Sequence, residues 1–215
     1  MARPFNFAED EYYHLYNRGT DRREIFSNEA DYRRFKSLLF ITNSKKPVDL
    51  GQHGSSFARV VEINRGEPLT AIGAYCLMPN HFHILVREVT SGGISKFMQK
   101  LTTGYTMYFN LLNKRTGTLF EGTFKAEHVD GDEYLKYLFA YIHLNPAKLI
   151  DPQWRESGMR KEIEDFTKKF PHSSYQDYLG ERIESAILTK PQFPEYFLNA
   201  DEFEKEMTEW LHFND

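Results

Sequence analysis

The spacing of hydrophobic residues along the chain changes between two patterns, which predict strands and helices. Short runs rich in aromatic and β-branched residues are typical of strands, and a Pro-Asn corner between two such runs predicts a hairpin. Apolar residues that recur every three or four positions predict helices. The strand candidates are residues 12–17, 57–63, 69–78, 81–88 and 123–129. The helix candidates run from the Asn28 cap to Ile41, over 94–112, and from Asp132 to a stop at Pro146.

The order of these elements predicts the fold class. Strands separated by two main helices, with hairpin connections among the middle strands, favour a ferredoxin-like antiparallel sheet with helices packed on one face. The predicted class is therefore α+β. Residues 151–215 contain mostly polar helical patterns broken by prolines, so we expect a domain over residues 1–150 and a C-terminal, mostly helical appendage over 151–215.

Composition narrows the class of protein. The chain has 215 residues, of which 40% are hydrophobic and 15% aromatic, which is typical of a folded globular protein and excludes a disordered one. No apolar run is long enough to cross a bilayer, and acidic residues near the N-terminus argue against a signal peptide. The single cysteine, Cys76, has no internal disulfide partner. We expect no membrane partner and a reducing, cytoplasmic location.

The charge is distributed unevenly. The net charge is −4, but residues 195–215 hold seven acidic side chains and one lysine, so residues 1–194 carry a net charge of +2. A mildly basic body with an acidic tail disfavours non-specific binding of duplex DNA through a broad basic face. Recognition of a short nucleic-acid strand stays open.

The first candidate for chemistry is the tripeptide His81-Phe82-His83. Alternate side chains of a strand share a face, so the two imidazoles point the same way and Phe82 points the other way. Two imidazoles on one face form half of a divalent-metal site. The alternative from the tripeptide alone is a pair of half-exposed histidines at the start of a strand.

The second candidate is Tyr141-Ile142-His143-Leu144-Asn145-Pro146. On a helix, Tyr141 and Asn145 are four positions apart and therefore share a face, whereas His143 points elsewhere. An amide oxygen is a ligand for a hard cation, and a phenol is a nucleophile once it loses its proton. Taken alone, the segment is better explained by a packing tyrosine and an asparagine at a helix end.

Together the two segments resemble the HUH nucleases, and most closely the REP-associated tyrosine transposase branch of the single-tyrosine HUH transposases. His-Phe-His after Pro-Asn matches the family's histidine motif, and Tyr-Ile-His-Leu-Asn-Pro resembles its nucleophile segment. The resemblance extends over about residues 12–180. Its further motifs are Asn17-Arg18-Gly19 with Ile25-Phe26, Gly117 to Gly122, and Phe170 to Tyr175 with Asp177-Tyr178-Leu179. Two positions depart from the family pattern: Thr123, where such sequences often have an arginine, and His172, where they often have a tryptophan.

The resemblance implies a site and a reaction. It assigns His81, His83 and Asn145 as metal ligands and Tyr141 as the nucleophile. The implied cofactor is a divalent ion, Mg²⁺ or Mn²⁺, which screens the phosphate charge and polarises phosphorus. The implied partner is single-stranded or hairpin DNA, cut and transferred through a 5′-phosphotyrosine intermediate. Candidate phosphate contacts are Arg18, Arg22, Arg23, Lys96, Lys100 and Lys125.

Two alternatives remain open at this point. The first is a non-catalytic regulator, derived from a transposase, that binds DNA hairpins. The second is a metallohydrolase that uses water, for which the loss of the Tyr141 hydroxyl leaves cutting intact. Tyr137 is a weaker second candidate for the nucleophile, and Tyr105 fits the apolar stripe of its helix. The protein could form a homodimer, and the sequence does not exclude a monomer.

Overall fold

The computed structural model describes residues 6–47, 56–158, 160–180, 182–197 and 199–212. It contains a four-stranded antiparallel sheet with the strand order β2-β3-β1-β4. The strands are β1 (Tyr12–Arg18), β2 (Thr70–Met78), β3 (His81–Glu88) and β4 (Lys125–His128). A tight turn at Pro79 and Asn80 joins β2 to β3, as the sequence predicts. In the described chain only the strand candidate over 57–63 is missing from this sheet.

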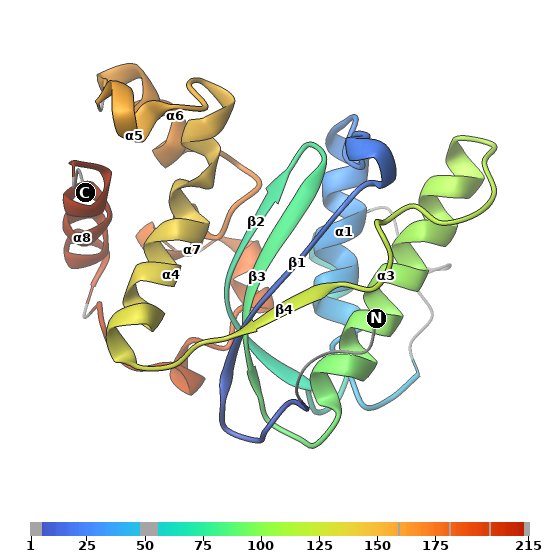
Figure 1. Cartoon of the computed structure of the whole chain (residues 1–215). Coiled ribbons are helices and arrows are strands. Elements are labelled where there is room, and N and C mark those ends of the chain that lie inside the picture. Colours follow the sequence, from blue (N-terminus) through green and yellow to red (C-terminus); the bar gives the residue numbers. More distant parts are fainter. Residues whose placement is uncertain (1–5, 48–55, 159, 181, 198, 213–215) are drawn as a thin grey trace.

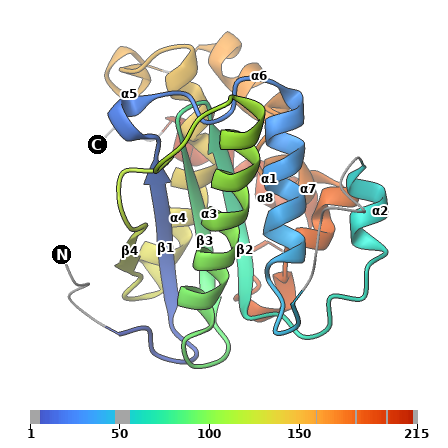
Figure 2. The same cartoon turned by 90° about the vertical axis from the view of Figure 1, so that its right-hand side faces the viewer.

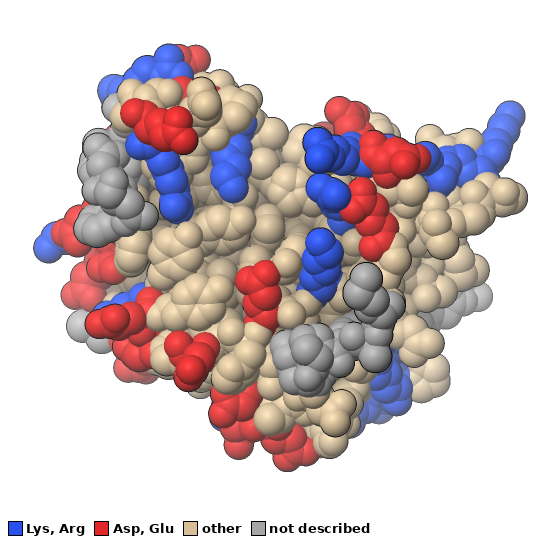
Figure 3. Space-filling view, viewed as in Figure 1, with Lys and Arg blue, Asp and Glu red and all other residues tan. Residues whose placement is uncertain are grey.

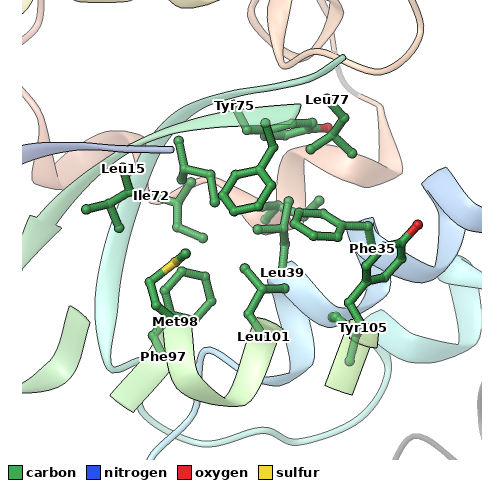
Figure 4. Packing of buried hydrophobic residues seen from close by; sticks show 14 of the residues in the cluster. Leu15, Phe35, Leu39, Ile72, Tyr75, Leu77, Phe97, Met98, Leu101 and Tyr105 are labelled. Carbon is green, nitrogen blue, oxygen red and sulfur yellow. The ribbon is translucent and has the colours of Figure 1, made fainter. Parts of the chain in front are cut away.

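Helices α1 (Glu29–Ile41) and α3 (Gly93–Leu112) connect the strands and cover one face of the sheet (Figure 2). The Asn28 side chain caps α1 by accepting hydrogen bonds from the backbone of Ala30 and Asp31. An apolar core fills the layer between these helices and the strands, with Leu15 and Ile72 from the sheet facing Phe35 and Leu101 (Figure 4). The α+β class and the ferredoxin-like antiparallel sheet, with α1 and α3 packed on one face, are confirmed.

The opposite face of the sheet is covered as well, which the sequence did not predict. Helix α4 (Asp132–Leu144) packs there through Leu135, Leu138 and Ile142, against alternate residues of β2 and β3 (Figure 1). The stripe of apolar residues on α4 does not reveal which face of the sheet it covers, because that depends on the chain's path after β4. The helices that follow pack against the outer side of α4: α5 (Trp154–Ser157), α6 (Lys161–Lys169), α7 (Tyr175–Leu179) and α8 (Ala200–His212).

The prediction of a strand over residues 57–63 is wrong, because residues Phe57–Val61 form the short helix α2. Phe57 and Val60 are both buried against α1, and their separation of three residues suits a helical face. A short apolar run fits either element, so tertiary packing decided the outcome. Single turns of 3-10 helix complete the described chain: η1 (Thr20–Arg22), η2 (Asn145–Leu149), η3 (Ile183–Ile187) and η4 (Lys190–Gln192).

The C-terminal part is anchored to the free edge of β2. The Leu77 amide donates to the His172 carbonyl at 2.9 Å, and the Ser174 amide donates to the Tyr75 carbonyl at 2.9 Å. The Tyr75 hydroxyl donates to Asp177 at 3.1 Å. The motif residues 170–179 thus cover a sheet edge that would otherwise present unpaired backbone groups. A domain boundary near residue 150 stays a prediction.

His172 has a packing role at this edge. Its ring stacks on Tyr32 of α1, with ring centroids 3.5 Å apart and an angle of 5° between the planes. Its Nε2 lies 3.1 Å from a Glu29 carboxylate oxygen. Because the side chain is buried against α1, it is not available to stack on a nucleic-acid base.

None of the helices in the described residues has the length and apolar character that a membrane span needs.

Candidate active site

The candidate site is a cavity of about 550 Å³ where the start of β3, the end of β1 and the C-terminal turn of α4 meet. His81 and His83 come from β3, Tyr141 from α4, and Asn145 from the turn that follows it. All four predicted residues line this one cavity. The sequence places them about 60 residues apart, and the sheet and α4 bring them together.

The turn after β1 and the turn between β2 and β3 are tied to each other beside the cavity. The Gly19 amide donates to the Asn80 carbonyl at 2.8 Å, and the amides of Ile25 and Phe26 both donate to the Pro79 carbonyl. A side chain at position 19 would place its Cβ 2.4 Å from the Arg23 carbonyl oxygen, so only glycine fits. The Asn-Arg-Gly motif therefore fixes the hairpin corner from which His81 starts.

The two imidazoles lie side by side and are neutral at pH 7. Burial lowers the pKa of His81 to about 4 and that of His83 well below its usual value, and the nearby Lys148 acts in the same direction. The His81 Nδ1 lies 2.6 Å from the Asn80 side-chain oxygen. Since that oxygen only accepts, Nδ1 carries the proton and the His81 Nε2 keeps its lone pair. No described residue hydrogen-bonds to the Nε2 of either ring, so this nitrogen is available as a ligand.

Tyr141 lies across the cavity from the histidines and is half-buried. Its ring is nearly perpendicular to that of His83, with centroids 5.5 Å apart. Burial raises the pKa of the Tyr141 phenol, while a hydrogen bond from Asn145 and the charge of Arg155 partly lower it. The phenol is therefore protonated at neutral pH and needs a nearby positive charge to act as a nucleophile.

Asn145 is held in place by two hydrogen bonds. Its side-chain amide donates to the Tyr141 carbonyl at 2.8 Å, and its oxygen accepts from the Lys148 amine at 3.3 Å. The Lys148 amine also lies 5.1 Å above the Tyr141 ring, which favours a cation–π contact. Partial burial lowers the pKa of Lys148. This lysine was not predicted, although it lies only three residues after Asn145 on the same turn.

The predicted basic residues separate into two groups. Arg18, Arg22 and Lys125 line the cavity, and Arg18 is paired with Glu121, whose carboxylate lies 2.5 Å from its Nε. The other group lies outside the cavity lining and consists of Arg23, Lys96 and Lys100. Figure 3 shows Lys and Arg side chains on both sides of the hollow between the end of α4 and the end of β1.

The residues outside the lining have other partners or positions. The Lys100 amine donates to the carbonyls of Ser44 and Lys46 at 2.7 and 3.2 Å. The Arg23 Nε donates to the Thr20 carbonyl at 3.1 Å, and Lys96 is an exposed residue of α3. Lys100 therefore stabilises a loop. The spacing of residues along a helix does not predict a contact of this kind.

A second, smaller cavity of about 310 Å³ lies on the other side of Tyr141 and His83. His14 of β1 and Glu127 of β4 line it, and neither was predicted. The His14 Nε2 lies 2.8 Å from the His83 Nδ1. Burial lowers the pKa of His14 to about 4, although the charge of Glu127 opposes this shift. The alternation of Tyr12, His14 and Tyr16 in the sequence indicates a strand face with polar groups. Only the register of the strands shows that His14 lies beside His83 and Glu127.

The rival tyrosines differ from Tyr141 in position. Tyr105 is fully buried and donates a hydrogen bond to the Ile25 carbonyl, as its place in the apolar stripe predicts. Tyr137 lines the second cavity and packs against Trp210, with ring centroids 5.5 Å apart. Of these three tyrosines, only Tyr141 lines the cavity that holds His81 and Asn145.

The donor set suits a divalent ion of intermediate character. Among the described residues, no cluster of three or more His, Cys, Asp or Glu side chains could hold a metal. Two neutral imidazoles and one amide oxygen provide a different set, in which two nitrogen lone pairs lack a protein partner. Such mixed nitrogen and oxygen ligands suit Mn²⁺ or Mg²⁺, whereas a structural Zn²⁺ site normally adds thiolates or carboxylates.

Comparisons with known proteins identify the family. The family model for IS200-like transposases matches residues 8–145, and the chain therefore belongs to this family. Among solved structures, a REP-associated tyrosine transposase bound to a REP hairpin aligns with a TM-score of 0.53, over 86% of this chain and 89% of that chain, at 12% sequence identity. At that identity the likeness shows the shared fold. No curated protein matches the chain.

Proposed function

We propose that this transposase cuts one strand of DNA beside a hairpin and holds the 5′ end as a phosphotyrosine on Tyr141. The observation that carries the proposal is the convergence of Tyr141, His81, His83 and Asn145 on one cavity. Membership of a transposase family supports a DNA-processing activity. The structural neighbour was solved with a REP hairpin, which supports hairpin DNA as the substrate class here.

In the proposed reaction the Tyr141 oxygen attacks phosphorus and the bond from phosphorus to the 3′ oxygen breaks. The phenol loses its proton and the departing oxygen gains one, so charge and atoms balance without a further reactant. The phosphoester bond is kept as a phosphotyrosine, and the free 3′-hydroxyl can be joined to another strand. A tyrosine rather than water as nucleophile is therefore what makes strand transfer possible.

The transposases of this family generally depend on a divalent metal ion. In this chain the Nε2 atoms of His81 and His83 and the Asn145 oxygen would hold it, and the bound ion would screen the phosphate charge and favour the phenolate. The Asn145 oxygen accepts from the Lys148 amine in the structure, so this positive charge lies beside the proposed ligands. Mg²⁺ and Mn²⁺ are both compatible with these ligands.

The basic residues at the cavity rim suit a single strand rather than a duplex. Arg22, Lys125 and Lys148 line the cavity and make no ion pair with the described residues. Their side chains provide phosphate contacts at the entrance to the site. Because Tyr141 is half-buried in the cavity, we expect the substrate strand to be unpaired where it reaches the tyrosine.

The test uses a labelled hairpin oligonucleotide with single-stranded flanks, the full chain, and Mn²⁺ or Mg²⁺. We expect a covalent DNA adduct that survives a denaturing gel and is absent with a chelator. Hairpin binding without an adduct would instead indicate a non-catalytic regulator. Cutting without an adduct would indicate a hydrolase that uses water.

A further inference from the structure

The second cavity contains a chain of polar groups that runs from β4 through β1 to His83. Glu127, His14 and His83 belong to three neighbouring strands, and the Cα atoms of His14 and Glu127 are direct partners in the register of β1 and β4. His14 lies two residues before Tyr16, the β1 residue opposite His83, so its side chain is on the same face as His83. The strands alone therefore bring the three side chains into line.

The distances between Glu127, His14 and His83 indicate which atom carries the proton in each contact. The His14 Nε2 and the His83 Nδ1 are 2.8 Å apart, so one carries a proton and the other accepts it. The His14 Nδ1 lies 3.8 Å from a Glu127 carboxylate oxygen, which is too long for a direct hydrogen bond but close enough for a charge to act. A negative carboxylate favours a proton on the facing nitrogen, so the neutral His14 ring carries its proton on Nδ1.

The position of the proton on His14 determines the tautomer of His83. With its proton on Nδ1, His14 has only a lone pair on Nε2, and the hydrogen between the rings must come from the His83 Nδ1. His83 then keeps its lone pair on Nε2. The Tyr16 hydroxyl, which donates to the other Glu127 oxygen at 2.7 Å, holds the carboxylate in position. The polarity of both rings is therefore set by one acidic residue at the half-exposed edge of the sheet.

We propose that His14 and Glu127 are positioning residues that hold His83 in the tautomer with its proton on Nδ1, so that its Nε2 serves as a metal ligand. The inference rests on the proposed function for its purpose, although the tautomer itself is a property of the metal-free protein. His81 has a matching arrangement, because Asn80 fixes the proton on its Nδ1. An outer partner of this kind orients a metal-binding histidine and increases its affinity for the ion.

The first test is nitrogen-15 NMR of the histidine rings in the metal-free full chain, with the His83 signals assigned by their loss in His83→Asn. We expect the wild-type His83 ring to carry its proton on Nδ1. In His14→Phe, which keeps a ring of similar size without an acceptor, we expect His83 to move toward the tautomer with the proton on Nε2. His14→Gln places an amide oxygen where the acceptor was, so it should restore the Nδ1 tautomer.

The second test is the affinity for Mn²⁺, measured by calorimetry without DNA. His14→Phe should weaken binding by about 10- to 100-fold, which is the usual effect of removing an outer partner. His14→Gln should recover most of the affinity. Glu127→Gln should weaken binding less than His14→Phe. Since Glu127 is half-exposed, its variant tests the relay even if His14→Phe fails to fold.

The two hypotheses fail in different ways. A wild-type His83 with its proton on Nε2, or variants with unchanged tautomer and unchanged Mn²⁺ affinity, would overturn the relay. Failure of the wild type to form a covalent adduct on hairpin DNA would overturn the proposed function and leave the NMR result intact. Hairpin binding in a chelator should be equal in all variants, and a loss there would show that the substitutions disturb the fold instead.

Discussion

The two faces of strand β3 are built from alternate residues and have opposite character. Phe82, Ile84 and Val86 face α1 and α3 in an apolar core and are fully buried. His81 and His83 face α4 and line the candidate site. One strand therefore contributes stability on one side and chemistry on the other, and neighbouring residues should respond to substitution in different ways.

The largest effect is expected for Tyr141→Phe. Removing the hydroxyl removes the proposed nucleophile, so adduct formation should fall by on the order of 10³-fold or more. The fold should be unchanged, because the ring and its packing are kept. Tyr137→Phe, one turn away on α4, is the matched control and should retain the adduct. An active Tyr141→Phe together with an inactive Tyr137→Phe would transfer the role to Tyr137.

The pair Phe82→Ala and His83→Ala tests the two faces directly. Phe82→Ala should lower the free energy of unfolding by about 3–5 kcal/mol, because it leaves a cavity in the core. The molecules that remain folded should still form the adduct. His83→Ala should abolish the adduct with a smaller loss of stability. Denaturant unfolding and the adduct assay on the same samples measure both effects, and equal losses of stability would remove the contrast between the faces.

A smaller effect, on the pH dependence of stability, is expected from His143. This residue is buried between α4 and the C-terminal helices. Its Nε2 lies 2.7 Å from the Ser174 hydroxyl oxygen, and burial lowers its pKa from 6.5 to about 3. The unfolded chain therefore binds a proton between these pH values that the folded protein excludes. Stability is nearly full at pH 7 and is lost as the pH falls through the unfolded pKa, by about 2 kcal/mol at pH 5.

His143→Gln is the variant that checks this prediction, since an amide can still bond to Ser174 and does not titrate. The decrease in unfolding free energy from pH 7 to pH 5 should be smaller in this variant by that amount. His14 and His172 contribute in the same direction in both proteins, so they cancel in the comparison. An identical pH dependence in both proteins would show that His143 is not the source.

The smallest effect is expected for Lys148→Met. Loss of one phosphate contact should weaken binding of single-stranded hairpin flanks by about tenfold and reduce the dependence of log affinity on log salt by about 1. Lys100→Met is the matched control, because the Lys100 amine is bonded to loop carbonyls outside the cavity lining. If Lys100→Met weakens binding as much as Lys148→Met, the DNA path lies along α3 instead.

The sequence was sufficient for the sheet and for the convergence of the four site residues. Period-two and helical spacing identified β3 and α4, and the resemblance to a family paired two motifs that lie far apart. The sequence was not sufficient to predict that His14, Glu127 and Lys148 lie beside the site. The first two matter only through the register of β1 against β3 and β4, which no local pattern encodes. Lys148 was overlooked because a lysine after a helix is most often a solvated charge.

Local sequence patterns also failed to predict helix α2 and the covering of the second face of the sheet. A five-residue apolar segment does not distinguish a strand from a helix, and α4 could have packed on either face until the chain's path was known. The unexpected face is where the candidate site lies. Local patterns therefore predicted the layer that stabilises the fold better than the layer that holds the chemistry.

The role of Tyr141 as the nucleophile can be tested by identifying the residue that carries DNA after reaction with a hairpin oligonucleotide and Mn²⁺. Protease digestion of the adduct, followed by mass spectrometry, locates the residual nucleotide on a peptide. We predict a phosphodiester-linked nucleotide on Tyr141. A nucleotide on any other residue, or strand cutting that leaves every tyrosine unmodified, would contradict it.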